Sequence, residues 1–158
     1  VPDQYPMTLN SATLGSNQKN NRWPVTDYSS AEVHVALQGL VMKHLAGRVN
    51  EGGQRVEKYR HNAREVFEVD DGALAVLAEL LMRGPQQPGE LRTRAERMVA
   101  LPTLEKLQEK LVRLMEKGYV KRLDPLPGER AERYAQTLCP DAHPLDVAGP
   151  VASKPAAT

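Results

Sequence analysis

An internal repeat constrains the fold of this chain more than any other feature of its sequence. Residues 37–59 resemble residues 111–134, and at a spacing of 74 residues Leu37, Leu40, Lys43 and Arg48 match Leu111, Leu114, Lys117 and Arg122. Beyond a glycine-containing turn the spacing becomes 75, where Gly53, Arg55 and Tyr59 match Gly128, Arg130 and Tyr134. One residue inserted at a hairpin tip explains the change, because loop tips tolerate insertions. Each copy is therefore predicted to contain a helix, a strand, a turn and a returning strand.

The second copy has three predicted helices before its hairpin. Residues 71–83 space their apolar side chains as an amphipathic helix does, and Gly84-Pro85 ends this helix. Pro88 begins a second helix, and Thr103 caps a third before strands at 119–123 and 132–138. Three helices followed by a hairpin is the order of a winged helix-turn-helix unit. A generic three-helix domain with a hairpin has the same order and no role in DNA binding.

The first copy has only the later part of this pattern. Ser29 and Glu32 form a capping box before a helix, and strands are predicted at 46–50 and 55–60. Residues 8–18 are predicted to form the preceding helix, followed by a polar linker at 19–28. The seven residues before Thr8 are too few for a first helix of about a dozen residues. We therefore expect the first unit to lack that helix, through a truncated start or because a partner chain supplies it.

These patterns together predict an α+β fold that is mostly α-helical with small β-hairpins. Two tandem winged helix-turn-helix units are expected, at residues 1–65 and 66–138, and the 158-residue chain has room for both. Residues 60–70 form the linker between them. Residues 139–158 are rich in Pro and Ala without an apolar stripe, which predicts a disordered tail.

Composition excludes several classes of protein. Lys and Arg number 21 against 20 Asp and Glu, a balance that is unlike a histone-like polycation. No apolar run approaches the ~18 residues that a membrane span needs, and no secretory leader is present. The only cysteine is Cys139, which excludes an internal disulfide and fits a reducing compartment. We therefore expect a cytoplasmic protein that does not enter a membrane.

The sequence indicates no catalytic residue, metal ligand or cofactor. No Gly-x-Ser-x-Gly elbow surrounds a serine, and neither a Walker-type phosphate loop nor a GxGxxG motif occurs. The four histidines are scattered, and Cys139 has no second cysteine with which to hold zinc. The expectation is a protein without enzymatic activity.

Basic and amide side chains favour binding of double-stranded DNA. Arginines cluster around the second helix of the second unit and lie on both hairpins, where they can contact phosphates. The polar stretch at 10–23 offers side chains of the kind that bind base edges. A solvated charged face and a capped helix end with a polar turn are the alternatives for these two regions. The predicted nucleic-acid-binding residues are Asn17, Gln18, Lys19, Arg22, Arg55, Arg92, Arg94, Arg97 and Arg130.

The helices in the position of a recognition helix favour a protein partner instead. The third helix of the second unit exposes Glu105, Glu109 and Glu116 beside basic residues, and carboxylates repel phosphates. Its counterpart in the first unit turns Val35 and Met42 outward, which suits a protein contact. The alternative to a regulator-like DNA-binding protein is therefore a protein-interaction scaffold of the kind found in chromosome-segregation accessory proteins. A homodimer is compatible with either function, although no segment is identified as its interface.

Three stretches of the chain resemble the YceH-like family of uncharacterised bacterial proteins. They are YPMTLNSATLGSNQKNNRWPV, RGPQQPGELRTRAERM and PGERAERY, and the resemblance covers nearly all of residues 2–138. The family is similar to tandem winged-helix proteins and normally has a leucine-rich helix before the matching start, which this sequence lacks. No activity is established for it, so the resemblance implies a fold and not a mechanism. The family's motif positions include Asn17, Gln18, Lys19, Asn21, Arg22, Gly89, Glu90, Leu91, Arg92 and Arg94.

Overall fold

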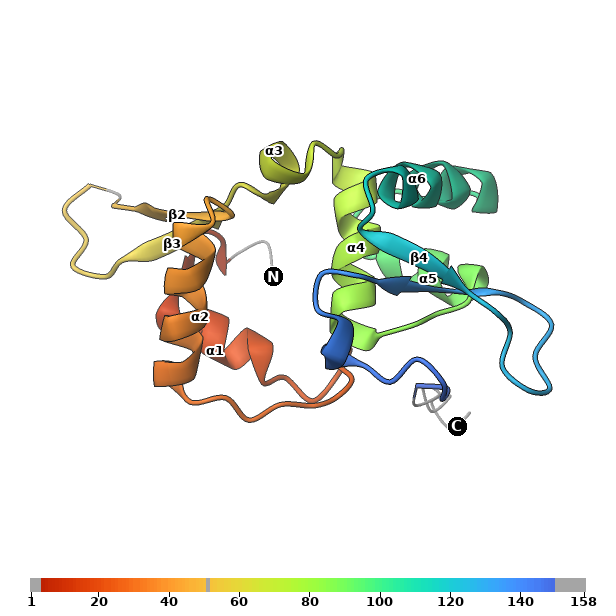
Figure 1. The fold of residues 1–158 in the computed structure, drawn as a ribbon. Helices are drawn as coiled ribbons and strands as arrows, with labels where there is room; N and C mark the ends of the chain where they lie inside the picture. The colour runs from red at the N-terminus through yellow and green to blue at the C-terminus, as the bar shows by residue number, and fades with distance from the viewer. Residues whose placement is uncertain (1–3, 51, 150–158) are drawn as a thin grey trace, which may run out of the picture. The chain divides into compact units, whose positions relative to one another are not determined.

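A computed structural model of the chain describes residues 4–50 and 52–149. The chain forms two compact units, Val1–Glu68 and Val69–Thr158, whereas the sequence placed the boundary between residues 65 and 66. The fold class is α+β as predicted, with six α-helices and two small antiparallel sheets among the described residues (Figure 1). No helix within these residues is long and apolar enough to cross a bilayer.

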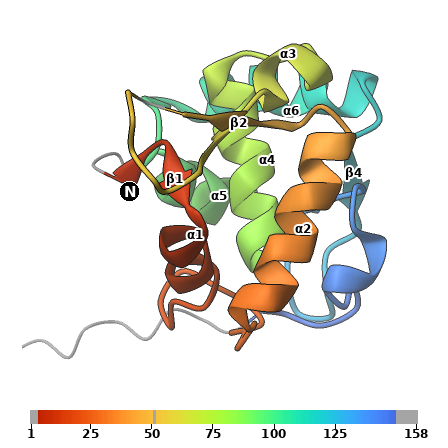
Figure 2. The same ribbon diagram turned by 90° about the vertical axis from the view of Figure 1, so that its left-hand side faces the viewer.

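Unit 1 combines two longer helices with a three-stranded sheet. The sheet has the order β1-β3-β2 with antiparallel neighbours, and β1 leads directly into α1 (Figure 2). The short helix α3 lies within the stretch that the sequence assigned to a linker. The elements are β1 (Met7–Thr8), α1 (Leu9–Ser16), α2 (Ser30–Met42), β2 (Ala46–Val49), β3 (Lys58–His61) and α3 (Ala63–Phe67).

The helices of unit 1 begin at side-chain caps. The Thr8 hydroxyl accepts a hydrogen bond from the Ser11 amide at the start of α1. The capping box predicted at Ser29 and Glu32 is confirmed, because each side chain accepts a hydrogen bond from the other residue's backbone N–H. These hydrogen bonds from Ser29, its backbone N–H foremost, lower the pKa of the Glu32 carboxyl. The carboxylate at the start of α2 is therefore fixed in place and ionised.

Unit 2 is built around α4, which packs against both other helices and against β5. Its bounds are those predicted, residues 71–83, and Pro88 opens α5 as expected. Leucines from all three helices, each less than 2% exposed, form much of the interior. The elements are α4 (Asp71–Arg83), α5 (Pro88–Ala95), α6 (Leu104–Glu116), β4 (Val120–Leu123), β5 (Arg133–Gln136) and the 3-10 turn η2 (Pro140–Ala142).

Asp70 ties the start of α4 to α6. Its Oδ1 accepts a hydrogen bond of 2.8 Å from the Ala73 amide, and its Oδ2 accepts one of 2.7 Å from Lys110 Nζ. The hydrogen bond from Lys110 is the main reason that the pKa of the Asp70 carboxyl lies below its usual value. One carboxylate thus caps the central helix and neutralises a cation of α6.

The repeat appears in the structure as two copies of one arrangement. Helices α2 and α6 each have 13 residues, and α6 begins 74 positions after α2. The hairpin loop spans residues 50–57 in unit 1 and residues 124–132 in unit 2, so the extra residue lies in the loop, where the sequence placed it. The matched residues are also the same cross-strand neighbours, Arg48 beside Tyr59 and Arg122 beside Tyr134.

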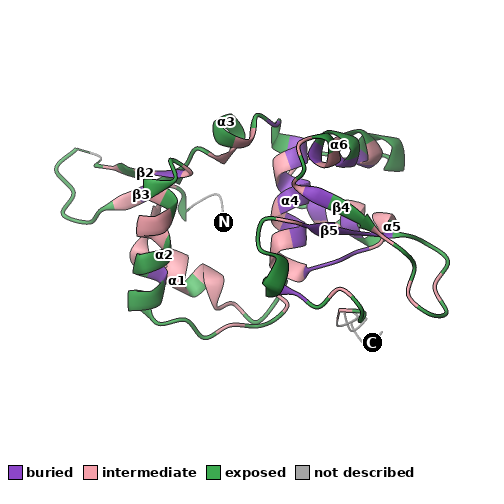
Figure 3. Ribbon diagram, in the orientation of Figure 1, coloured by how far each residue is buried: buried purple, intermediate pink, exposed green. Residues whose placement is uncertain are grey.

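The two copies differ in how well the inner face of the matched helix is covered. Leu111 and Leu114 on α6 are fully buried, whereas the matching Leu40 on α2 is 41% exposed. Figure 3 shows the difference, since α4 and β5 contain long buried stretches while α1 and α2 are mostly intermediate or exposed. Among the described residues of unit 1, no helix covers α2 as α4 covers α6.

The segment after β5 differs from the disordered tail that the sequence predicted. Gln136 binds the main chain of Cys139 twice, with Oε1 accepting from its N–H at 2.8 Å and Nε2 donating to its carbonyl at 2.7 Å. Arg133 Nη2 donates to the Leu145 carbonyl at 2.7 Å, and His143 is buried beside Gly84. Composition does not reveal such contacts, because they come from side chains of β5. Residues 150–158 of the expected tail lie outside the described residues.

Candidate interaction surfaces

Asn17, predicted to contact bases, closes the loop between α1 and α2. Its Nδ2 donates to the Tyr28 carbonyl at 2.7 Å, and its Oδ1 accepts from the Tyr28 amide at 2.7 Å. The same oxygen accepts from the Thr26 hydroxyl at 3.2 Å. The amide is thus bonded on both sides to the far end of the loop, which is the local backbone bonding that competes with a role in DNA contact.

The neighbouring polar residues are also largely engaged within the loop. Gln18 Nε2 donates to the Asn20 carbonyl at 2.8 Å, and Arg22 Nη2 donates to the Gly15 carbonyl at 2.9 Å. Lys19 is exposed and makes no side-chain hydrogen bond or ion pair with the described part of the chain. Of the four residues predicted here, only Lys19 has a side chain with no hydrogen bond or ion pair to the described residues.

Two of the arginines around α5 make hydrogen bonds and ion pairs within unit 2. Arg92 Nη1 donates to the Leu101 carbonyl at 2.9 Å and lies 3.3 Å from Glu96 Oε2. Arg94 Nη1 donates to Gln86 Oε1 at 2.9 Å, and its side chain is only 13% exposed. Arg97 is exposed in the turn that follows α5. A phosphate would therefore have to compete with existing acceptors for Arg92 and Arg94.

Gln86 explains why Arg94 matters to the fold. Its main chain exchanges two hydrogen bonds with Tyr134 on β5, of 3.1 and 2.9 Å, and its side chain is buried. This bridge holds the start of α5 against the sheet, as the pairing of Met7 with Tyr59 does in unit 1. The contact from Arg94 thus stabilises a structural element that recurs in both units.

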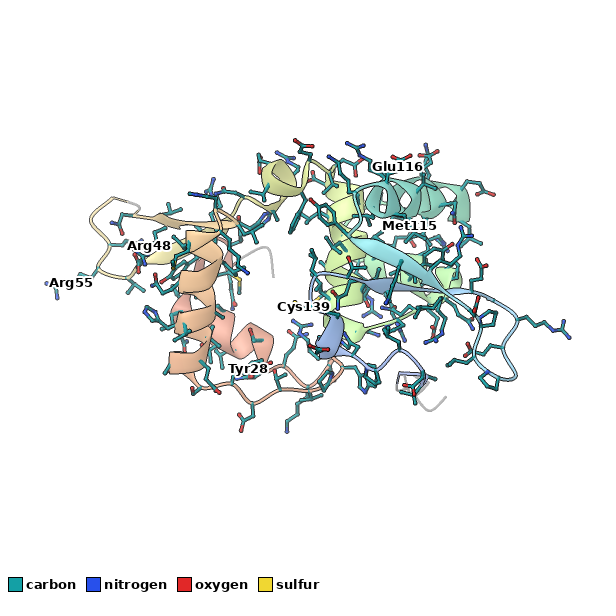
Figure 4. The ribbon with its side chains drawn as sticks, viewed as in Figure 1. Tyr28, Arg48, Arg55, Met115, Glu116 and Cys139 are labelled. Atoms are coloured by element: carbon teal, nitrogen blue, oxygen red, sulfur yellow. The ribbon has the colours of Figure 1, made fainter. Side chains whose placement is uncertain are left out.

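The arginines predicted on the hairpin loops are exposed. Arg55 extends from the β2–β3 loop away from the helices of unit 1 (Figure 4), and Arg130 is exposed in the β4–β5 loop. Neither makes a side-chain hydrogen bond or an ion pair with residues that the structure describes. The predicted residues within each unit therefore lie on separate elements: Arg55 and Arg130 are on the hairpins, Lys19 is in the loop after α1, and Arg92 and Arg94 are engaged on α5.

The outward face of α6 is charged but internally balanced. Lys106 Nζ lies 3.3 Å from Glu109 Oε2, and Arg113 Nη1 lies 3.9 Å from Glu116 Oε2. Lys110 is bound to Asp70. Each basic residue of this helix thus has a carboxylate neighbour, and the face carries no excess of positive charge for a phosphate backbone.

The matching face of α2 is apolar and exposed. Val35 is 70% exposed and Met42 82% exposed, and the repeat aligns them with Glu109 and Glu116. Helix α2 contains no Lys or Arg between Ser30 and Met42. We call the following residues the α2 apolar face: Ala31, Val35, Ala36, Gly39 and Met42, which align with Glu105, Glu109, Lys110, Arg113 and Glu116.

The exposure of Val35 and Met42 is not caused by the incomplete packing on the opposite, inner face of α2. In unit 2, α4 packs against α6, and Glu109 and Glu116 are nevertheless exposed. A helix packed against α2 in the same way would therefore leave Val35 and Met42 exposed. The sequence already turned both residues outward, but only the aligned copies show that five charged positions on one helix are apolar or glycine on the other.

No group of three or more His, Cys, Asp and Glu side chains lies close enough to hold a metal ion within residues 4–50 and 52–149. Cys139 is a free, exposed thiol.

Comparison with known proteins places the chain beside bacterial proteins of unknown function. The family described as "Protein of unknown function, DUF480" matches residues 1–129. A UPF0502 protein of Geotalea daltonii is 50% identical over 138 residues, which are 86% of this chain and 63% of the relative. A UPF0502 protein of Geobacter sulfurreducens is 47% identical over 87% of this chain and 64% of the relative. One from Solibacter usitatus is 39% identical over 95% and 72%. The chain thus spans less than two thirds of the length of the first two relatives.

Proposed function

Since the chain belongs to the DUF480 family, the UPF0502 or YceH-like proteins of unknown function, we propose on its own geometry that it is a non-enzymatic protein-interaction module. The α2 apolar face is the surface that binds the partner. The proposal includes a cytoplasmic location, in keeping with the single cysteine of the sequence.

The architecture we propose for each unit is a winged helix-turn-helix. In unit 2, α4, α5 and α6 followed by the β4–β5 hairpin have the order of that motif, and unit 1 repeats the part from α5 onward. Helices α2 and α6 then occupy the position from which DNA-binding members of this class enter the major groove. A helix without Lys or Arg that begins with an ionised Glu32 is poorly suited to that groove.

The exposure of Val35 and Met42 carries the proposal. Burial of one such side chain contributes about 1.5–3 kcal/mol, so two on one helix face supply much of the apolar centre of a small interface. In unit 2 the same positions are glutamates, which keep that helix solvated. The difference between two otherwise matched helices supports a binding role for the α2 apolar face specifically.

Photo-crosslinking from this face tests the proposal. A benzophenone side chain placed at Met42 in the expressing bacterium is expected to give a covalent adduct with another protein chain. The same probe at Glu116, the aligned exposed position on α6, serves as the matched control and is expected to give far less. Equal yields from the two positions, or no adduct from either, would count against the α2 apolar face as a binding surface.

Double-stranded DNA is the second candidate partner, and the hairpin loops favour it. Arg55 and Arg60 are exposed on or beside the β2–β3 hairpin, and Arg130 is exposed on the other hairpin. Wing loops of this kind can follow a phosphate backbone without the help of α2 or α6. A hairpin contact of this kind gives weak affinity with little base selectivity, because it uses phosphates alone.

A salt series distinguishes the DNA hypothesis from the first proposal. If the hairpins bind phosphate, fluorescence anisotropy on a random duplex will show micromolar affinity that falls linearly with log salt concentration. Each of Arg55→Ala and Arg130→Ala should lower the slope by about one unit. Lys106→Ala, whose cation is paired with Glu109, should leave the slope unchanged. Absence of binding at low salt would exclude this candidate, since electrostatic attraction is strongest there.

A further inference from the structure

We propose that the occupant of the α2 apolar face is a second copy of this chain, bound through an antiparallel α2–α2 pair. This inference rests on the proposed function, because it names the partner of the same surface. A two-fold axis crossing α2 near its middle would place identical faces against each other, as in the symmetric interfaces of most homodimers.

Charge complementarity at the two ends of α2 supports this pairing. Glu32 lies in the first turn and Lys43 is the C-cap residue, and both are exposed. Their separation of 11 residues corresponds to about 16 Å along the helix and to nearly whole turns, so they lie on the same side. Val35 and Met42 lie between them in sequence. In an antiparallel pair, Glu32 of one copy faces Lys43 of the other, and this pairing occurs twice.

The local contacts of these two charges leave them available for the partner. Ser29 donates both of its hydrogen bonds to Oε2 of Glu32, and no described residue donates to Oε1. The Lys43 ammonium makes no hydrogen bond or ion pair with the described residues. The capping box also fixes the carboxylate in its ionised form, so it is ordered before the partner arrives.

Gly39, near the middle of the same stripe, is a second observation that fits close contact between two helices. A Cβ built on it would meet no atom within 4 Å, so packing within the chain does not require glycine there. Glycine inside a helix is less stable than alanine, because it loses more conformational freedom on folding. A partner backbone that approaches at the centre of the pair explains the residue, because only glycine leaves room for it.

Other occupants fit these observations less well. A duplex DNA would meet an apolar surface with a carboxylate at one end. An unrelated amphipathic helix would need to carry the complementary pattern of a basic end, an apolar centre and an acidic end. A second α2 has that pattern by symmetry.

Sedimentation equilibrium of the purified chain tests the inference. From the low micromolar to the submillimolar range, the mass is expected to rise towards twice the 17.5 kDa of one chain. Val35→Glu should raise the dimer dissociation constant about 30-fold, because it buries two unpaired carboxylates in each dimer. Val112→Glu on α6, at a position that is also exposed, is the matched control and should leave the constant within about twofold.

A charge exchange tests the antiparallel geometry. Lys43→Glu should weaken the dimer about tenfold, because each new carboxylate faces Glu32 of the other copy. Adding Glu32→Lys should restore much of the affinity. The double variant has no capping box and has both helix-end charges reversed, so a more stable helix cannot account for its recovery. Gly39→Leu should weaken the pair while far-ultraviolet circular dichroism shows an intact helix content.

The outcomes also separate this inference from the proposed function. A chain that stays monomeric at submillimolar concentration, or a dimer that Val35→Glu and Val112→Glu affect equally, overturns the α2–α2 pair. If such a monomer still gives an adduct from Met42 with a different protein, the proposed interaction function stands without the pair. If neither association nor an adduct is found, both are wrong.

Discussion

Replacement of Leu114 by alanine is expected to lower the free energy of unfolding of unit 2 by about 3 kcal/mol. Leu114 lies on α6 with no exposed surface, so the change removes buried methyl groups and leaves a cavity. The same substitution at the matching Leu40 on α2, which is 41% exposed, should cost unit 1 only about 1 kcal/mol. The repeat thus provides one substitution at two equivalent positions with different burial.

Urea unfolding, monitored by hydrogen exchange, measures the loss of stability of each unit separately, because exchange reports on each helix. Trp23 is the only tryptophan and lies in unit 1, so its fluorescence gives a second measure of the Leu40→Ala effect. Leu104→Ala on α6, at a side chain that is 51% exposed, controls for a change of leucine on that helix. Equal losses at Leu114 and Leu40 would show that the inner face of α2 is covered in solution as fully as that of α6.

The sequence was sufficient to predict α1, α2, α4, α5 and α6 because the signals that start and end a helix are local, whereas it predicted neither β1 nor α3. The capping box at Ser29, the cap at Thr103 and the proline at Pro88 each mark a helix end by the chemistry of one or two residues. The repeat then supplied the hairpins and the position of the extra loop residue. The resemblance to the YceH-like family, drawn from three short stretches, is confirmed by the match to DUF480 and by the UPF0502 relatives.

The contacts of the polar side chains could not be predicted in the same way. Asn17 has an amide that serves a base edge and a backbone loop equally well, and the choice depends on Tyr28, which lies eleven residues away. The sequence predicts Arg94 as a phosphate contact, and it does not reveal that Arg94 Nη1 donates a hydrogen bond to Gln86 Oε1. In both cases the partner is a tertiary contact that composition does not reveal.

The sequence predicted the candidate surface only in part. Helical periodicity already turns Val35 and Met42 outward, but a single helix cannot show whether an apolar outward face is unusual. The repeat spacing of 74 residues aligns α2 with α6 residue by residue, and the structure shows which α6 positions are exposed when α4 packs behind them. The comparison shows that Val35 and Met42 belong to an apolar surface, because the aligned positions on α6 are charged.

Composition predicts a disordered tail after β5, and Gly84 gives the sharpest test of the packing observed for residues 139–149. Gly84 has φ +80° at the end of α4, and a Cβ on it would lie 2.8 Å from two ring atoms of His143. Gly84→Ala is therefore expected to lower the free energy of unfolding of unit 2 by about 3 kcal/mol, from backbone strain together with the clash. Hydrogen exchange over residues 139–149 should rise at the same time.

Two further variants separate strain from the clash. Gly128→Ala has a similar φ of +85° with no atom within 4 Å of its Cβ, so it should cost only about 1 kcal/mol. In a His143→Ala background, Gly84→Ala should likewise cost about 1 kcal/mol, because the ring that it would strike is gone. If Gly84→Ala costs the same in both backgrounds, the ring does not pack on Gly84 in solution. A cost that depends on His143 instead makes residues 139–149 part of unit 2, held through Gln136, Arg133 and the glycine at the end of α4.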